Sequence, residues 1–297
     1  MLIRFGFEID IECSEPVPML LALSAHTELQ GRLIGLDFVR TPEASNAWVY
    51  LDRFGNRVTR MLAPIGSTKL WSDCVVEFDG HLDAQVPSAE QHAIAELPND
   101  VLEFLMASRY CDSDNLVKEA WALFGQSPEG WQRVETIIKF VHDHVTFGYQ
   151  FGRANKTASE VFREKTGVCR DFAHLSIALC RAMNIPARYA SGYLGDIGVP
   201  YSGAGDFCAW FEVFLGGRWY TFDARYNTPR AGRILMVRGA DAADVAMITS
   251  FGGYQLKYFK VWTNKLEDGL DDAVILEMLQ TRPGGEPLVF PSSARVA

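Results

Sequence analysis

The sequence lacks three features that would assign it to a common class: an excess of positive charge, a long apolar run and a paired cysteine pattern. Its 28 Lys and Arg residues are outnumbered by 37 Asp and Glu residues, which gives a formal net charge of −9. A nucleic-acid-binding protein presents a basic surface to phosphate, so nucleic acid is not expected as a partner. No stretch reaches the roughly 18 apolar residues of a membrane helix, so no membrane partner is expected either.

The first residues also lack the pattern of a secretory signal. Residues 1–16 (MLIRFGFEIDIECSEP) alternate between apolar and other residues, and no small-residue cleavage pattern follows them. The six cysteines are widely spaced and follow no tight motif, which is typical of thiols in a reducing compartment. These absences predict a cytoplasmic protein, and we expect no cofactor and no bound metal.

Hydrophobic periodicity divides the chain into a β-rich first part, a mixed core and a short extension. Residues 1–90 should form the β-rich domain, with strands at 1–12, 47–51, 56–64 and 74–78. The turn at 52–56 should join two of these strands into an antiparallel hairpin. Residues 19–29 fit either a short helix or further strand.

Residues 91–265 should form the core domain and residues 266–297 a partly flexible extension. Pro98 gives a helix start signal, and two more helices are predicted at 113–126 and 130–144. The later strands are predicted at 186–193, 209–215, 218–223 and 255–263, with a Gly216-Gly217 turn joining the second and third. The tail from Arg282 has the Pro, Gly and Ser content of a mobile segment.

One stretch has the arrangement of a nucleophile site. Residues 166–193 (TGVCRDFAHLSIALCRAMNIPARYASGY) contain a sharp turn at Gly167, then Cys169 in the first turn of a helix. Free N–H groups and the helix dipole at that position favour a thiolate. Pro186 should end the helix and start a strand. A buried structural cysteine is the alternative for Cys169.

This stretch resembles the nucleophile segment of the transglutaminase-like superfamily, whose core is papain-like and which includes bacterial proteins. A second block, DFCAWFEVFLGGRWYTFD at residues 206–223, resembles the strand, turn, strand and acid of that family. The resemblance implies an α+β protein. It would consist of an N-terminal β-sandwich-like domain and a transglutaminase-like core, with a central helix packed on an antiparallel sheet.

The resemblance also implies a catalytic Cys, His and Asp in that order. Cys169 falls on the nucleophile and Asp223 on the orienting acid, but Cys208 stands where the family usually has histidine. Catalytic candidates are therefore Cys169, Cys208 and Asp223. Tyr149, Gln150 and Trp210 are candidates for oxyanion or substrate contacts, although aromatic packing explains Tyr149 equally well.

None of the six histidines lies in the strand that should present the base. His174 is nearest to Cys169 in sequence but lies about 140° around the helix, so we expect it to pair with Arg170 and Asp171. His142 and His144 end a helix, where an imidazole interacts favourably with the dipole.

Two further segments are expected near the site. Arg225, Arg230, Arg233 and Arg238 follow Asp223 closely and should form a solvated or ion-paired surface, or else a carboxylate-binding wall. The Gly-rich stretch at 194–206 should be a loop, either a wall on the substrate side or inert.

Three functions follow from these residues. In the first, Cys169 forms a thioester with a protein or peptide substrate, and the protein is a hydrolase or acyltransferase. In the second, the fold is retained without catalysis and the cleft binds a peptide or a partner protein. In the third, Cys169 and Cys208 form a disulfide or, with Asp223, bind a soft metal. The sequence does not set the oligomeric state.

Overall fold

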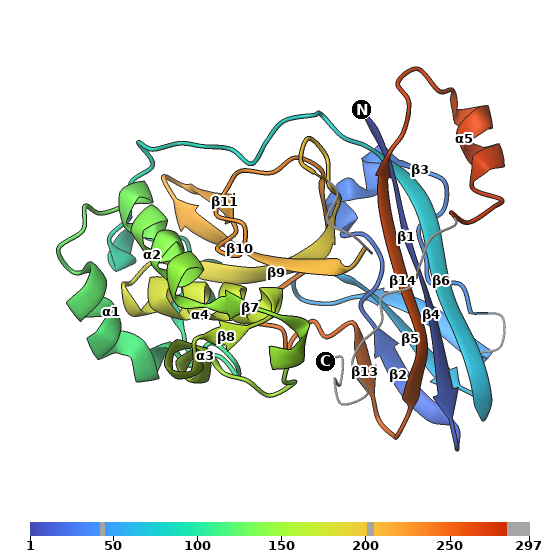
Figure 1. Ribbon diagram of the computed structural model, residues 1–297, viewed down its shortest axis with the longest axis horizontal. Coiled ribbons are helices and arrows are strands. Elements are labelled where there is room, and N and C mark those ends of the chain that lie inside the picture. Colours follow the sequence, from blue (N-terminus) through green and yellow to red (C-terminus); the bar gives the residue numbers. More distant parts are fainter. Residues whose placement is uncertain (42–44, 201–204, 284–297) are drawn as a thin grey trace.

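The computed structural model describes residues 1–41, 45–200 and 205–283, and they form an α+β protein, as predicted. A β-sandwich lies at one side of the molecule and a mixed helix and sheet core lies at the other (Figure 1). The nucleophile helix belongs to the core. The two parts share one continuous cluster of buried apolar side chains.

The sandwich consists of two four-stranded antiparallel sheets. The first has, in spatial order, β14 (Gln255–Lys265), β1 (Leu2–Cys13), β6 (Gly66–Glu77) and β3 (Leu33–Ile34). The second has β13 (Ile248–Ser250), β2 (Val17–Leu21), β5 (Arg57–Ala63) and β4 (Ser45–Leu51). The predicted hairpin is confirmed, because β4 pairs with β5 across the turn at 52–56.

Strand β1 positions the sandwich against the core. Its alternating Ile3, Phe5, Phe7, Ile9 and Ile11 are all buried, which is why this period-two pattern forms a strand with one apolar face. The ring of Phe5 lies 5.0 Å from that of Tyr193, and the ring of Phe7 lies 6.1 Å from that of Phe207. The apolar face of β1 therefore packs against strands that carry the site.

The last two strands of the chain return to the sandwich. Strand β14 pairs with β1 from Ile3 opposite Lys265 to Glu12 opposite Gln255, and β13 pairs with β2. The sequence predicted the strand at 255–263 but placed it in the core. A strand's local pattern does not say which neighbour it pairs with, so its partner lay outside the reach of periodicity.

The core has a four-stranded antiparallel sheet in the order β11-β10-β9-β12. Its strands are β9 (Ala187–Leu194), β10 (Phe207–Leu215), β11 (Arg218–Phe222) and β12 (Arg233–Gly239). The helices are α1 (Val117–Phe124), α2 (Trp131–His144), α3 (Ala158–Glu164) and α4 (Cys169–Ala182). Both glycines of the β10–β11 turn have positive φ, 53° and 82°, which suits a two-residue hairpin turn.

Helix α4 is the centre of the core. All of its residues from Asp171 to Ala182 are buried, and it packs on β9 and β10 on one side and on α1, α2 and α3 on the other. It ends at Met183, after which Asn184 takes the left-handed conformation (φ 61°) before Pro186 begins the approach to β9. The predicted helix and its stop signal are confirmed.

Three local predictions differ from the structure or are decided by it. The helix expected from Pro98 is only a 3₁₀ turn, η3 (Leu102–Leu105). The segment 19–29, for which both helix and strand were predicted as alternatives, contains the end of β2 and the start of η1 (Thr27–Arg32). The extension contains α5 (Asp272–Met278), and the mobile tail predicted from Arg282 lies almost wholly outside the described residues.

Polar contacts fix the sandwich to the core. The buried Asn56 amide donates to the carbonyl of Arg238 at 2.7 Å and accepts from its N–H at 2.8 Å. Arg233 in turn binds Asp83, which lies in the segment that connects the two parts. Across the described ranges, no helix is long and apolar enough to cross a membrane.

Candidate active site

Cys169 is the first residue of α4, and the turn before it is tightly built. The carboxylate of Asp171 accepts from the N–H of Val168 at 2.9 Å. A Cβ on Gly167 would lie 2.6 Å from the Cβ of Asp171, so only glycine fits there. This turn leaves Cys169 partly exposed, whereas the other five cysteines are buried.

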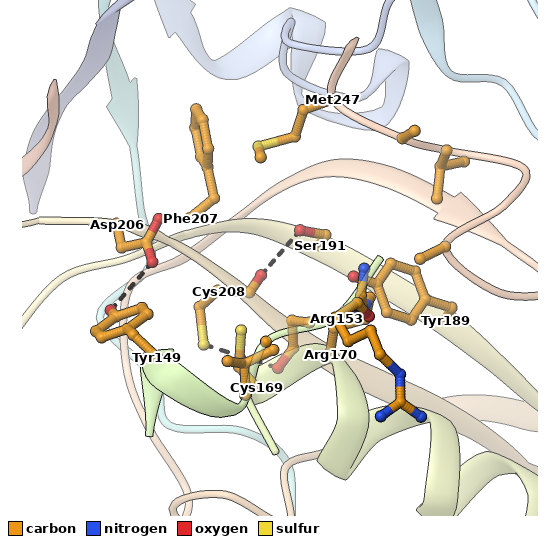
Figure 2. Close-up of a pocket in the computed structure, with 16 residues that line it drawn as sticks. Tyr149, Arg153, Cys169, Arg170, Tyr189, Ser191, Asp206, Phe207, Cys208 and Met247 are labelled. Carbon is orange, nitrogen blue, oxygen red and sulfur yellow. Dashed lines mark hydrogen bonds between the residues drawn. The ribbon is translucent and has the colours of Figure 1, made fainter. Parts of the chain in front are cut away.

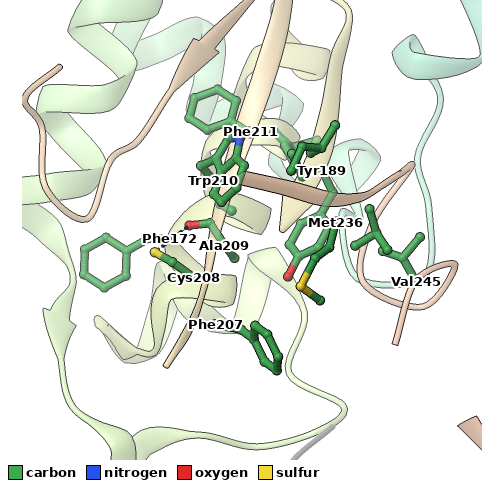
Figure 3. Close-up of a cluster of buried hydrophobic side chains, with 14 of the residues drawn as sticks. Phe172, Tyr189, Phe207, Cys208, Ala209, Trp210, Phe211, Met236 and Val245 are labelled. Carbon is green, nitrogen blue, oxygen red and sulfur yellow. Dashed lines mark hydrogen bonds between the residues drawn. The ribbon is translucent and has the colours of Figure 1, made fainter. Parts of the chain in front are cut away.

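Cys208 faces Cys169 from strand β10. Cys208 is the hydrogen-bond partner of Cys169. Its sulfur also lies 3.7 Å from the carbonyl oxygen of Ala209 (Figure 2). Cys208 belongs to the buried apolar cluster that also holds Phe172, Phe207 and Trp210 (Figure 3). All six cysteines of the chain are free thiols.

The charges around the pair favour opposite protonation states for the two sulfurs. The hydrogen bond from Cys208 lowers the pKa of Cys169, and so do the charge of Arg225 and the backbone of Ala209, whereas burial and the charge of Asp206 raise it. The pKa of Cys208 is raised by the hydrogen bond to Cys169, by burial and by the charge of Asp223. Of the two sulfurs, Cys169 is therefore the one that loses its proton more readily.

Asp223 is held in place by a complete set of donors. Its Oδ1 accepts from the N–H groups of Arg225 at 2.9 Å and Tyr226 at 3.3 Å, and its Oδ2 accepts from Arg233 Nη2 at 3.1 Å. The guanidinium of Arg233 also donates from Nε to both oxygens of Asp83 at 3.0 Å. The acid of the expected triad is thus buried and firmly oriented.

Arg225 supplies the positive charge nearest to the sulfur pair. Its guanidinium lies 3.7 Å from the centre of the Phe147 ring, which fixes its side chain above the segment that precedes Cys169. It lowers the pKa of Cys169 as described above. Arg225 follows Asp223 by two residues, so the turn after β11 brings both a carboxylate and a cation to the site.

The two sulfurs line a cavity of about 130 Å³. One wall is the segment 242–247, which leads from the core back to the sandwich, and it contributes Ala242, Val245, Ala246 and Met247. The remaining lining is Tyr149, Gly152, Arg153, Val168, Arg170, Tyr189, Ser191, Asp206, Phe207 and Ala209. The cavity is thus largely apolar, and Cys169 and Cys208 lie in its lining.

Tyr149 and Asp206 form a polar pair in this cavity. The hydroxyl of Tyr149 donates to Asp206 Oδ2 at 3.0 Å (Figure 2). Burial raises the pKa of Asp206 to about 6, although the bond from Tyr149 opposes that shift. Asp206 lies two residues before Cys208 on the approach to β10, and it is the titratable carboxyl that faces the cysteine pair within this cavity.

The other two predicted contact residues lie away from the lining. Gln150 is exposed, and its side-chain amide folds back beside Gly148. Trp210 is buried, with its ring 5.1 Å from the guanidinium of Arg233. Trp210 therefore supports the arginine that orients Asp223.

The ion pair predicted for His174 is wrong, because its ring binds the backbone of Ala242. Arg170 pairs with Asp171 at 3.6 Å, while His174 Nε2 accepts from the N–H of Ala242 at 3.1 Å. Burial lowers the pKa of His174 to about 3, so its ring is neutral. Its position 140° from Cys169 is what brings it to the segment 242–247, whose first residue it anchors.

His142 and His144 lie in the last turn of α2, as predicted, and their rings lie beside carbonyls of other segments. Nδ1 of His142 lies 3.0 Å from the carbonyl of Ala224, and Nε2 of His144 lies 2.7 Å from that of Phe162. Both rings therefore bind carbonyls that lie outside their own helix.

Three of the four arginines after Asp223, namely Arg230, Arg233 and Arg238, are ion-paired, as one reading predicted, and these three are largely buried. Arg230 contacts the carbonyl of Gly195 at 3.1 Å and Asp196 at 3.6 Å. Arg238 joins Glu212 and Glu28. Together with Arg233 they hold the fold, which leaves Arg225 as the member of the run that acts on the cysteines.

A metal site has little support in this arrangement. Within the part of the chain that the structure describes, no group of three His, Cys, Asp or Glu residues is placed to hold a metal ion. Both oxygens of Asp223 already accept from N–H donors. The soft-metal alternative for the cysteine pair thus lacks a ligand set.

Sequence reasoning missed Asp206 and the part that Arg225 plays. Asp206 begins the block DFCAWF, so its spacing from Cys208 was visible, but the burial that raises its pKa was not. Arg225 was seen only as one of a run. No sequence pattern predicted that the segment 242–247 lines the cavity, because its position depends on the return of the chain to the sandwich.

Comparisons with known proteins agree with this geometry. Residues 120–224 match the transglutaminase-like superfamily. A solved structure from Cytophaga hutchinsonii, described as a candidate cysteine protease, is 29% identical. It superposes with a TM-score of 0.79 over 91% of this chain and 92% of its own. An uncharacterized protein of Mycobacterium leprae is 26% identical over 222 residues, which is 71% of this chain and 78% of that protein. The chain thus carries a transglutaminase-like core, as its two sequence blocks predicted. In the sequence this core follows the first strands of the β-sandwich.

Proposed function

We propose that this protein is a cysteine-dependent acyl hydrolase or acyltransferase that forms a thioester at Cys169. The observation that carries the proposal is the placement of Cys169: a partly exposed thiol at the start of α4, at the base of a cavity, with its pKa lowered. A thiolate at this position is a strong nucleophile toward an acyl carbon.

The acyl group that fits is small and apolar. The cavity of about 130 Å³ has Val168, Phe207, Val245 and Met247 in its lining, so it suits a short aliphatic or methylated side chain. We therefore propose a protein or peptide substrate that inserts one such side chain. The free thiols fit a reducing compartment, and we retain the cytoplasm as the proposed location.

The need to protonate the leaving group determines which bonds this site cleaves. In a complete triad the imidazole protonates the departing amine, and its loss typically costs roughly 10²- to 10⁴-fold. Arg225 remains protonated and does not donate. Asp206 has a pKa of about 6, so about a tenth of its carboxyls are protonated at pH 7. We propose that Asp206 donates this proton slowly and that thioesters and activated esters, which need no acid, react faster than amides.

Trapping the acyl-enzyme tests the proposal. The protein is mixed with the thioester of a short branched acid, quenched in acid, and its peptides are analysed by mass spectrometry. We expect one acyl group on the peptide that contains Cys169. Cys180→Ala should acylate at the same rate, because Cys180 is buried in the same helix and its pKa is raised. Acylation that persists in Cys169→Ala, or that never appears, would contradict the proposal.

A second function is favoured by one observation, the thiol in place of the usual histidine at position 208. On this reading the cavity binds a peptide or a partner protein and Cys169 performs no chemistry. The acylation experiment separates the two readings. Binding of an apolar peptide without acylation of Cys169, at an alkylation rate equal to that of an ordinary thiol, would establish the second function.

A further inference from the structure

The cysteine pair has chemistry that acyl transfer does not use. Cys169 and Cys208 come from different elements, α4 and β10, that pack on each other, and both sulfurs line the same cavity within hydrogen-bonding contact. Both are free thiols. A dithiol that opens to a substrate cavity is a redox site as well as a nucleophile site. We propose that Cys169 and Cys208 together reduce an organic hydroperoxide and close into a reversible disulfide.

Cys169 is the sulfur that meets the peroxide. It is partly exposed, whereas Cys208 is only 5% exposed. It lies at the helix N-terminus, where the dipole favours its anion, and Arg225 adds a full positive charge. Low pKa, access and a neighbouring thiol are the three properties of a cysteine that hydroperoxides oxidise.

The first step balances on one sulfur and one peroxide. The Cys169 thiolate attacks a peroxide oxygen, and the S–O bond forms as the O–O bond breaks. The second oxygen leaves as the alcohol after it takes one proton from solvent, and Cys169 becomes a sulfenic acid. The charge of Arg225 favours the Cys169 thiolate that makes this attack.

The second step uses Cys208. Its sulfur attacks the sulfenic sulfur, the S–S bond forms, and the oxygen departs as water with the Cys208 proton. The two thiols have then lost two electrons and the peroxide has gained them. The two side chains are hydrogen-bond partners, and the sulfurs must approach each other to reach the roughly 2.05 Å of a disulfide. An external dithiol returns the pair to its reduced state.

The cavity sets the class of hydroperoxide. Val168, Phe207, Val245 and Met247 make it mostly apolar, and its volume of about 130 Å³ admits a small alkyl group. Tert-butyl hydroperoxide is a probe of that size. The inference uses the same nucleophile as the proposed acyl chemistry but goes beyond it, since the peroxide reaction needs Cys208 and no acyl group.

The test compares full-length variants after the addition of one equivalent of tert-butyl hydroperoxide. In the wild type, non-reducing peptide mass spectrometry should find Cys169 joined to Cys208. In Cys208→Ser, dimedone should trap a sulfenic acid on Cys169, because the second thiol is gone. Cys180→Ala should behave as the wild type, and Cys169 should oxidise roughly a hundredfold faster than Cys180. Thermal unfolding of each variant confirms that it is folded.

Acylation of Cys169 by a thioester, measured on the reduced wild type, keeps the two activities distinguishable. A disulfide without acylation would support the redox site while the acyl proposal fails, and acylation without a disulfide would do the reverse. The redox inference is overturned if peroxide leaves both thiols free to alkylate, or if a sulfinic acid accumulates on Cys169 as fast in the wild type as in Cys208→Ser.

Discussion

The two sides of the site differ in how completely they are built. On the acid side, Asp223 accepts from two backbone N–H groups and from Arg233, and Arg233 is tied in turn to Asp83. On the other side, the Cys208 side chain has a thiol partner and a carbonyl 3.7 Å away. The frame that would orient an imidazole is intact, while the position of the imidazole holds sulfur.

Asp223 contributes to the cysteine pair through its charge, after the hydrogen bond to Cys169, burial and the charge of Cys169. Without a ring to orient, its negative charge raises the pKa of Cys208, while Arg225 lowers the pKa of Cys169. The result is a pair in which Cys169 loses its proton more readily and is the nucleophile, while Cys208 keeps its proton. The following substitutions alter one side of the site at a time.

The largest effect is expected from restoring the imidazole. Cys208→His places a ring between Cys169 and the already oriented Asp223, and we expect turnover of an anilide amide to rise by roughly 10²- to 10⁴-fold. Cys208→Asn is the matched control, since it has similar size but no titrating group. A gain in Cys208→Asn equal to that in Cys208→His would show that space at position 208, and not a base, limits the reaction.

On the acid side, the largest loss of stability is expected from replacing Arg233, which orients Asp223. Arg233→Met leaves the carboxylates of Asp83 and Asp223 buried without their shared cation, and we expect the free energy of unfolding to fall by about 3–5 kcal/mol. Urea unfolding measures this loss. Arg218→Met removes an exposed arginine that lies over Tyr220 and should cost far less. Equal losses in the two variants would refute the structural role of Arg233.

The sequence predicted the architecture of the core because its signals are local. Gly167, Cys169 and the Ile185-Pro186 stop define α4, and Gly216-Gly217 defines the β10–β11 turn. The partner of β14 and the wall at 242–247 depend on long-range return of the chain, which local periodicity does not encode. Asp206 was in view beside Cys208, but its role depends on burial, a property of the folded cavity.

A smaller effect is expected at Asp206, and it depends on pH. The neutral carboxyl is the proton donor, so amide turnover should fall as pH rises through about 6, whereas thioester turnover should continue to rise as Cys169 ionises. Asp206→Asn should lower amide turnover by roughly tenfold or more. The thioester profile should keep its rise but move to lower pH, because the charge of Asp206 raises the pKa of Cys169. Amide and thioester profiles of the same shape, unchanged in Asp206→Asn, would remove Asp206 from the mechanism.

The smallest effect is expected at Arg225. Arg225→Met retains an apolar contact with Phe147 but removes the charge that lowers the pKa of Cys169. We expect the midpoint of Cys169 alkylation against pH to rise by about one unit, which corresponds to a loss of roughly 1.4 kcal/mol of thiolate stabilisation. Arg218→Met again serves as the control, and a midpoint that stays in place would assign the activation to the helix end and Cys208 alone.

The central claim is that Cys169 is an activated thiolate, and the pH dependence of iodoacetamide labelling tests it most directly. Labelling of each cysteine is followed by peptide mass spectrometry, with Cys180 of the same helix as the internal reference. The account predicts that Cys169 labels much faster than Cys180, with a midpoint clearly below the free thiol value of about 8.5. A midpoint at or above that value, at an ordinary rate, would contradict it.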